Sequence, residues 1–178
     1  SSGILKSKIL ENNLVETEMG IPKTNWDEIP LDKEIDTKNL KIKISDKNKK
    51  KHIGGTAINV GNPHVVFFVN DIENFDLKNV GPEIENHDLF PEKCNVTLAK
   101  KINDNLIKVK VWERGAGLTK ACGTAACATA VVGNLLNLTD KTVDIEFELG
   151  KLTISIDAKN SIHMKGPVSN IKDIEIKL

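Results

Sequence analysis

The chain has 178 residues, of which 39% are hydrophobic and 28% charged, and its 25 basic and 25 acidic side chains give a net charge of zero. These values are typical of one globular domain, or of two small lobes that share an interface. The balanced charge argues against nucleic acid as a partner, because proteins that bind phosphate backbones concentrate positive charge. The sequence has no apolar run long enough to span a membrane, so no membrane partner is expected.

The N-terminus and the cysteines bear on the compartment. Ser1-Ser2-Gly3 is typical of an expression scar, and residues 1–13 are interpreted as a tag or lead-in to a domain over residues 14–178. No signal peptide is visible. Three cysteines without paired spacing fit neither a disulfide framework nor a metal site. A cytoplasmic location is therefore expected, or a plastid if the source is a plant.

Short strands separated by turn residues dominate the first two thirds of the chain. Alternating apolar and polar residues predict a half-buried strand over residues 14–19, ended by Gly20. The stretch 22–51 is polar and irregular apart from a strand at 40–44, and the lysines at 47–51 are interpreted as a solvated turn rather than a phosphate site. Further strands are expected over residues 64–69, 95–98, 106–112, 143–149, 151–156 and 161–165, the first of them buried on both faces.

Two segments predict helices. Residues 79–88 suit a short helix that ends before Pro91, and the alanine-rich residues 121–136 suit a longer one. In the longer helix Val131, Val132, Leu135 and Leu136 form an apolar stripe. The elements together predict an α+β fold with many strands and one central helix.

A glycine-rich loop leads into the longer predicted helix and places Cys122 at its N-terminus. Unpaired N–H groups of the first turn suit a carboxylate, and the same partial positive charge is expected to lower the pKa of the thiol. Gly123 has no side chain that would block the close approach of a ligand, and Thr124 adds a hydroxyl. The alternative is that Cys122 is a small buried residue in a tight turn. Cys94 and Cys127 are expected to be inert.

A second candidate is Gly61-Asn62-Pro63-His64, between two apolar segments. Pro63 fixes the turn and holds the Asn62 amide and the His64 imidazole at the entrance of a strand. Such groups can bind the carboxylate and ammonium of an amino acid, or shuttle a proton. Taken alone, the interpretation that they satisfy turn backbone groups is favoured.

The third candidate is Trp112-Glu113-Arg114-Gly115, at the end of an alternating strand that runs into the cysteine loop. Neighbouring residues of a strand point to opposite faces, so Glu113 and Arg114 are not expected to pair with each other. A surface pair without a role is the usual outcome, but the position beside the loop favours a function.

Together these elements resemble the diaminopimelate epimerase family, in register from about Leu14 to the end. Proline racemases and phenazine-pathway isomerases share the broader fold, but the motif that runs from Trp112 to Thr124 is not expected in them. The matching elements are the run from Val111 to Gly117, Ala121-Cys122-Gly123-Thr124, Gly61-Asn62-Pro63-His64, Asn95-Val96 after Phe90-Pro91, and Met19-Gly20-Ile21-Pro22.

Two departures qualify the resemblance. The first catalytic cysteine of the family, in a Cys-Gly-Asn-Gly context, has no counterpart here, and Leu118 stands where a polar residue is expected. The chain therefore resembles the C-terminal half of the family. The resemblance implies one lobe in which a mixed or antiparallel sheet wraps around a central helix.

The family interconverts LL- and meso-diaminopimelate, on the route to lysine and peptidoglycan, by proton transfer between two cysteines. The resemblance implies that Cys122 is one of the pair, without pyridoxal phosphate and without a metal. Gly123 and Thr124 would donate backbone hydrogen bonds to the reacting carboxylate. Glu113 would bind the distal ammonium, or assist proton movement with His64.

The distal end of the small-molecule substrate would be held by Asn62, Asn95 and Arg114, with Arg114 on its carboxylate. The missing N-terminal lobe is the implied partner, and with half a cleft the chain is expected to have negligible activity alone. An exposed apolar face would favour self-association, for example as a homodimer. Two other readings stay open: a thiol hydrolase built from Cys122, His64 and an asparagine, and a non-catalytic module that binds an anion or a partner.

Overall fold

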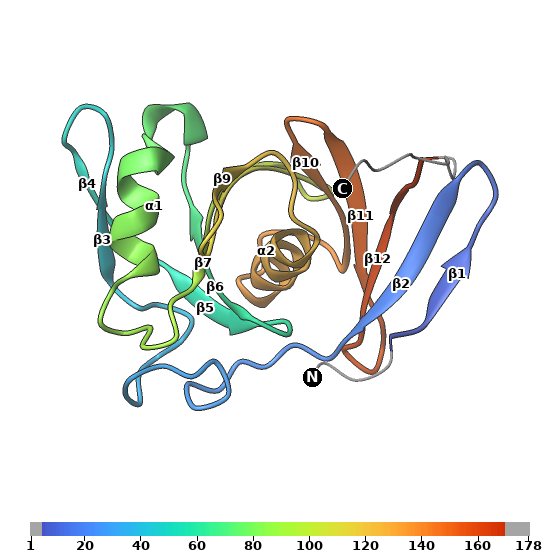
Figure 1. Cartoon of the computed structure of the whole chain (residues 1–178), viewed down its shortest axis with the longest axis horizontal. Helices are drawn as coiled ribbons and strands as arrows, with labels where there is room; N and C mark the ends of the chain where they lie inside the picture. The colour runs from blue at the N-terminus through green and yellow to red at the C-terminus, as the bar shows by residue number, and fades with distance from the viewer. Residues whose placement is uncertain (1–4, 170–178) are drawn as a thin grey trace, which may run out of the picture.

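A mixed sheet curves around one helix in the computed structural model, which describes residues 5–169 (Figure 1). The described residues form ten strands in this sheet, mostly antiparallel, with parallel pairing between β6 and β7 and between β8 and β10. The α+β fold with a sheet around a central helix is thereby confirmed. In spatial order the strands are β1 (Ser7–Ile9), β2 (Leu14–Gly20), β12 (Ile162–Pro167), β11 (Gly150–Ile156), β10 (Thr142–Phe147), β8 (Leu106–Glu113), β7 (Asn95–Asn103), β6 (Pro63–Phe68) and β5 (Thr56–Asn59), with β9 (Gly117–Thr119) against β8.

The two ends of the sheet approach each other. After β2 the chain runs beneath the helix toward β5, as Figure 1 shows, and the backbones of Lys23 and Asn59 exchange hydrogen bonds of 2.8 and 3.0 Å. This short bridge joins the segment that follows β2 to the far edge of the sheet. The helix is consequently enclosed on most sides.

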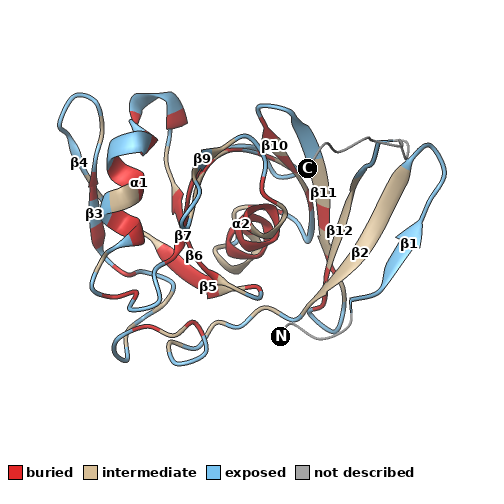
Figure 2. Cartoon of the chain, viewed as in Figure 1, coloured by how far each residue is buried: buried red, intermediate tan, exposed pale blue. Residues whose placement is uncertain are grey.

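The central helix α2 (Gly123–Leu135) is buried almost all round, with every residue from Ala125 to Gly133 buried (Figure 2). The expected apolar stripe is therefore wrong as a description. Alanine side chains are small enough for strands to approach the helix from every direction, so no polar face is needed. Leu135 and Leu136, assigned to the stripe, are half-buried at its C-terminal end.

A second layer covers the outer face of β6, β7 and β8. It consists of α1 (Leu77–Glu85), the 3₁₀ turn η1 (Ile72–Asn74), and the hairpin of β3 (Ile42–Ser45) and β4 (Lys51–Gly54). Apolar residues on both faces leave β6 buried throughout, apart from its last residue. The expectation of a strand buried on both faces is thereby confirmed.

The boundaries of the shorter helix differ from the prediction. It starts at Leu77 because Asp76 caps it, the carboxylate accepting the Lys78 N–H at 3.1 Å. It ends at Glu85 because Asn86 leaves the helical conformation and its side-chain amide donates to the Pro82 carbonyl at 2.8 Å. The predicted helix had been placed too far along the chain at both ends.

Other boundaries also shifted. Strand β7 continues to Asn103, beyond the predicted end at residue 98, because its outer half pairs with β8 as a hairpin. Strand β4 begins at the end of the stretch expected to be irregular and β5 follows it, and the sequence did not predict either of them. The turn between β3 and β4 is shaped by Asp46, whose carboxylate accepts the N–H groups of Asn48 and Lys50 at 2.9 Å each.

The N-terminal lead-in contains β1, which pairs with β2. Ser1-Ser2-Gly3 and the residues after 169 lie outside the described part of the chain. Within residues 5–169, no helix has both the length and the apolar character needed to cross a membrane.

Candidate active site

The Cys122 thiol lies between the end of the β8–β9 hairpin and the start of the central helix. Cys122 is the N-cap residue of α2, with an extended backbone (φ −151°), and only 8% of it is exposed. Its Sγ lies 3.5 Å from the Thr124 hydroxyl. The first turn of α2 therefore presents a thiol, a hydroxyl and unpaired N–H groups at one point.

The protonation of Cys122 differs from the prediction. Burial raises the pKa of this thiol above its ordinary value of 9.0, and the neighbouring Glu113 carboxylate raises it further. The Thr124 hydroxyl and the Ala125 N–H lower the pKa, but burial outweighs them. The expected lowering by the helix N-terminus is thus wrong for the net effect, and Cys122 is a protonated thiol at neutral pH.

His64 is buried in a small cluster of amides at the entrance of β6. Its Nε2 lies 2.9 Å from Asn62 Oδ1 and 3.5 Å from Asn95 Nδ2, while its Nδ1 is buried and has no hydrogen-bond partner within the described residues. Burial, and then the charge of Arg114, lower the pKa of His64 to about 3. The imidazole is therefore neutral, with Nε2–H donating to Asn62.

Glu113 and Arg114 face different neighbours, as the alternation of a strand requires. Glu113 contributes to the raised pKa of Cys122. The Arg114 guanidinium instead donates to the Glu92 carbonyl at 2.7 Å and contributes to the lowered pKa of His64. Within residues 5–169 the structure shows no ion pair between the two side chains. The arrangement also places Glu113 with the thiol and His64 with the amides.

A cleft of about 680 Å³ opens beside the start of α2. Asn62 and Thr124 line it together with the end of β2 at Met19 and Gly20. Gly123 is half-buried, and a Cβ at this position would lie 3.1 Å from the sulfur of Met164, but neither residue lines the cleft. The structure thus brings Asn62 of the first motif and Thr124 of the second into one concave region, whereas the other predicted site residues do not line it.

Sequence reasoning missed Glu85. This buried carboxylate accepts the indole N–H of Trp112 at 2.7 Å and the backbone N–H of Gly115 at 3.0 Å. A single glutamate at the end of an amphipathic helix carries no local signal of such a role. Its partners lie about thirty residues further along the chain and are brought to it by the fold.

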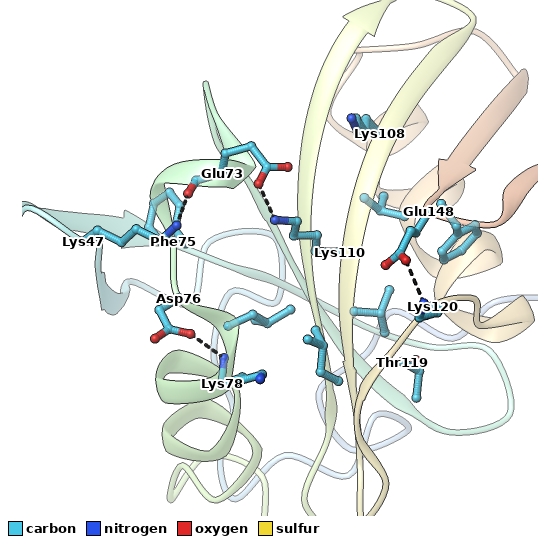
Figure 3. Close-up of a pocket in the computed structure, with 15 residues that line it drawn as sticks. Lys47, Glu73, Phe75, Asp76, Lys78, Lys108, Lys110, Thr119, Lys120 and Glu148 are labelled. Carbon is cyan, nitrogen blue, oxygen red and sulfur yellow. Dashed lines mark hydrogen bonds and ion pairs between the residues drawn. The ribbon is translucent and has the colours of Figure 1, made fainter.

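A second hollow of about 550 Å³ lies on the outer surface, between the start of α1 and strands β8 and β9 (Figure 3). Its rim carries five lysines, and two of them are paired: Lys110 with Glu73 and Lys120 with Glu148 at 2.8 Å. None of the predicted site residues lines it. The candidate site is therefore the cleft beside α2. In residues 5–169, no group of three or more His, Cys, Asp or Glu side chains is arranged to hold a metal ion.

Comparison with known proteins decides the family. Residues 56–171 match the family model described as diaminopimelate epimerase. This chain belongs to the diaminopimelate epimerase family. The protein named diaminopimelate epimerase from Pelagibacter ubique is 78% identical over all 178 residues, which make up 65% of its length. The protein of that name from Afipia carboxidovorans is 46% identical over 143 residues, covering 80% of this chain and 49% of that protein.

The chain thus spans between about half and two thirds of the family relatives that it matches. Solved structures agree on the fold. A predicted epimerase from Pseudomonas aeruginosa superposes with a TM-score of 0.56 at 13% identity, covering 92% of this chain and 58% of that one. A probable proline racemase from Agrobacterium radiobacter superposes with a TM-score of 0.57 at 10% identity, covering 93% and 55%. The fold is therefore that of a lobe of these epimerases.

Proposed function

We propose that this chain is the C-terminal part of an enzyme that interconverts LL- and meso-diaminopimelate without pyridoxal phosphate or a metal. The carrying observation is the position of the Cys122 thiol at the start of α2, 3.5 Å from the hydroxyl of Thr124, which lines the cleft together with Asn62. The family membership supports the substrate, and the geometry supports the chemistry. The product would serve lysine and peptidoglycan synthesis.

Inversion of an amino-acid α-carbon needs two proton-transfer groups on opposite faces. A thiolate on one face removes the α-proton, and the thiol of Cys122 donates its proton to the other face, so that Cys122 ends as the thiolate. In the reverse direction Cys122 is the base. Burial, with a smaller contribution from the Glu113 carboxylate, raises the pKa of the thiol and so keeps Cys122 protonated for the donating direction.

The carbanion that forms must be stabilised, because an α-hydrogen is a very weak acid. The unpaired N–H groups of Gly123 and Thr124 at the start of α2 suit the reacting carboxylate, where negative charge accumulates. The site is nearly closed to water at Cys122, which strengthens these interactions.

The distal end of the substrate would be bound at the other side of the cleft. Asn62 faces the cleft, and the guanidinium of the exposed Arg114 is free to exchange the Glu92 carbonyl for a carboxylate. Asn95 is buried with its amide engaged by Pro63 and Arg114 backbone groups, so its contribution is to hold Arg114 in place. His64 is neutral and faces Asn62, which favours a role in orienting that amide.

The second thiol would lie on an N-terminal lobe, and the chain alone would be inactive because one thiol cannot serve both faces. Large apolar side chains on and near β1, after β2 and after β12 remain exposed and suit contact with that lobe or a second copy. They are Leu5, Ile9, Leu10, Ile21 and Val168. The free thiols suit a reducing compartment such as the cytoplasm.

The test joins this chain to the N-terminal part of the Pelagibacter ubique relative that the chain does not match. LL-diaminopimelate is then incubated in deuterium oxide, and both the meso product and α-deuterium are measured. The expected result is that both appear together, that both are lost in Cys122→Ala, and that both remain in Cys127→Ala, the matched control on the same helix. A folded fusion that exchanges no deuterium would refute the proposal.

A thiol hydrolase is the competing function. It requires an imidazole on the thiol, but His64 is hydrogen-bonded to Asn62 and has no hydrogen bond to Cys122 within the described residues, while Glu113 is the group beside Cys122. The geometry therefore favours proton transfer by the thiol itself. An acyl-enzyme formed at Cys122 with an activated ester would favour the hydrolase instead.

A further inference from the structure

Glu85 is a buried carboxylate with both oxygens engaged. It is the last residue of α1 and 7% of it is exposed. Its Oε2 accepts the Trp112 indole N–H at 2.7 Å, and its Oε1 accepts the Gly115 backbone N–H at 3.0 Å. An ionised carboxylate that receives two N–H donors makes strong, directional bonds, and both donors are thereby fixed relative to α1.

The two partners of Glu85 stand on either side of Glu113 and Arg114. On one side, the indole of Trp112 also packs against α1, where Gly81 has no side chain to separate them. On the other side, Gly115 adopts φ +75° in the turn that the Ala116 N–H closes onto the Glu113 carbonyl at 3.0 Å. The strand end is therefore clamped before and after Glu113.

We propose that Glu85 is a positioning residue of the proton-transfer site, which holds the end of β8 so that the Glu113 carboxylate stays beside Cys122. The inference rests on the proposed function, because it assigns Glu85 to that same site. Glu85 contacts no substrate group itself. It acts through Trp112 and Gly115 on the placement of Glu113.

A purely structural role makes a different prediction. If Glu85 merely stabilised the fold, its loss would lower the free energy of unfolding but leave the interaction between Glu113 and Cys122 intact. The groups that act on the Cys122 thiol are the Glu113 carboxylate, the Thr124 hydroxyl and the Ala125 N–H, with the neutral Cys127 thiol nearby. Among these, Glu113 carries the charge that Glu85 would position.

The experiment reads Cys122 in this chain directly. The alkylation rate of Cys122 by iodoacetamide is measured against pH by peptide mapping, in the parent chain, Glu85→Gln, Glu113→Gln and the double variant. Glutamine keeps the shape of Glu85 but turns its amide N–H₂ toward one of the two donors, so one hydrogen bond is lost. The thiolate is the reactive form, so the midpoint of the profile reports the thiol pKa.

We expect Glu113→Gln to move the midpoint to lower pH, because it removes the charge that opposes the thiolate. We expect Glu85→Gln to move it in the same direction, with alkylation below the midpoint faster by about threefold or more. The double variant should match Glu113→Gln, since Glu85 acts through Glu113. Glu83→Gln, an exposed glutamate on the same helix, is the matched control and should leave the profile unchanged.

If Glu85→Gln fails to fold, Trp112→Phe replaces it, because it removes one donor and keeps an aromatic ring on Gly81. A smaller shift in the same direction is then expected. The inference is overturned if the folded variant has the parent midpoint, or if the double variant shifts beyond Glu113→Gln. No substrate enters this measurement, so the two proposals can fail separately. If the midpoints shift as expected but the completed enzyme is inactive, the proposed function is refuted and the role of Glu85 in placing Glu113 stands.

Discussion

Asn95 holds Arg114 through its backbone: the side-chain oxygen of Asn95 accepts the Arg114 N–H at 2.9 Å. The amide nitrogen of the same side chain donates to the Pro63 carbonyl at 3.0 Å. One buried side chain therefore joins the ends of β6, β7 and β8, which carry His64, Asn95 and Glu113. This amide therefore fixes the motif at Pro63 and the motif at Arg114 relative to each other.

Replacing Asn95 with aspartate should destabilise the fold. The new oxygen would face the Pro63 carbonyl in a buried place, so the donor is lost and two acceptors oppose each other, at a cost of about 1–3 kcal/mol in the free energy of unfolding. Urea unfolding followed by circular dichroism measures it. Asn103→Asp is the control, because within the described residues Asn103, at the other end of β7, makes a side-chain hydrogen bond only through its oxygen, toward the Asn105 N–H, and aspartate can do the same. Equal losses in the two variants would contradict the assignment.

The three cysteines should differ in reactivity. Burial raises the pKa of Cys127 to about 12 and raises the pKa of Cys94 strongly, whereas the pKa of Cys122 is raised less. At about pH 8.5, Cys122 should be alkylated at least about ten times faster than either of the others in the folded chain. Peptide mapping after timed iodoacetamide treatment decides the order. In denaturant the three should react alike, and equal rates without denaturant would count against the buried positions of Cys94 and Cys127.

Gly81→Ala should destabilise the contact between α1 and β8. A Cβ at this position would lie 2.5 Å from the indole ring of Trp112, so the ring must move, at a cost of about 1–3 kcal/mol. Thermal unfolding and Trp fluorescence report the loss of stability and the displacement of the ring. Gly54→Ala is the control, because its Cβ would meet nothing within 4 Å, and its effect should stay within about 1 kcal/mol. A neutral Gly81→Ala would show that Trp112 is not held against α1.

His64 should make the fold sensitive to acid. Its pKa is about 3 when folded and 6.5 ordinarily, so below about pH 6.5 the unfolded chain binds a proton that the folded chain refuses. Stability is therefore lost as the pH falls from about 6.5 toward 3, by about 2 kcal/mol at pH 5. Urea unfolding at about pH 7.5 and pH 5 measures the difference, which should shrink by that amount in His64→Gln. An unchanged difference would mean that His64 is protonated in the folded state.

Much of the site could be read from the sequence, because the chemistry is carried by short motifs. The glycine-rich loop before an alanine-rich segment places Cys122 at a helix start, and strand alternation separates Glu113 from Arg114. These are consequences of local backbone geometry, and the structure confirms both. Most strands of the sheet were predicted for the same reason, from alternating residues or continuous apolar runs, but β1, β5 and β9 were not predicted.

Other features depended on residues far apart in the chain. Sequence reasoning predicted a lowered pKa for Cys122 from the helix N-terminus, but burial and the Glu113 carboxylate are supplied by packing and reverse the net effect. In the same way, α2 is buried on nearly all sides, whereas the sequence predicted one apolar stripe. The bridge between Lys23 and Asn59, which helps to enclose the helix, joins residues that are far apart in the sequence.

The sequence by itself determined the family and predicted Cys122 as the reactive thiol, because both inferences rest on contiguous residues with fixed spacing. Only the tertiary structure decided the raised pKa of that thiol and the hydrogen bonds from Trp112 and Gly115 to Glu85. Desolvation and hydrogen bonds between distant segments arise when the chain packs, and Glu85 meets Gly115 only after α1 has docked on β8.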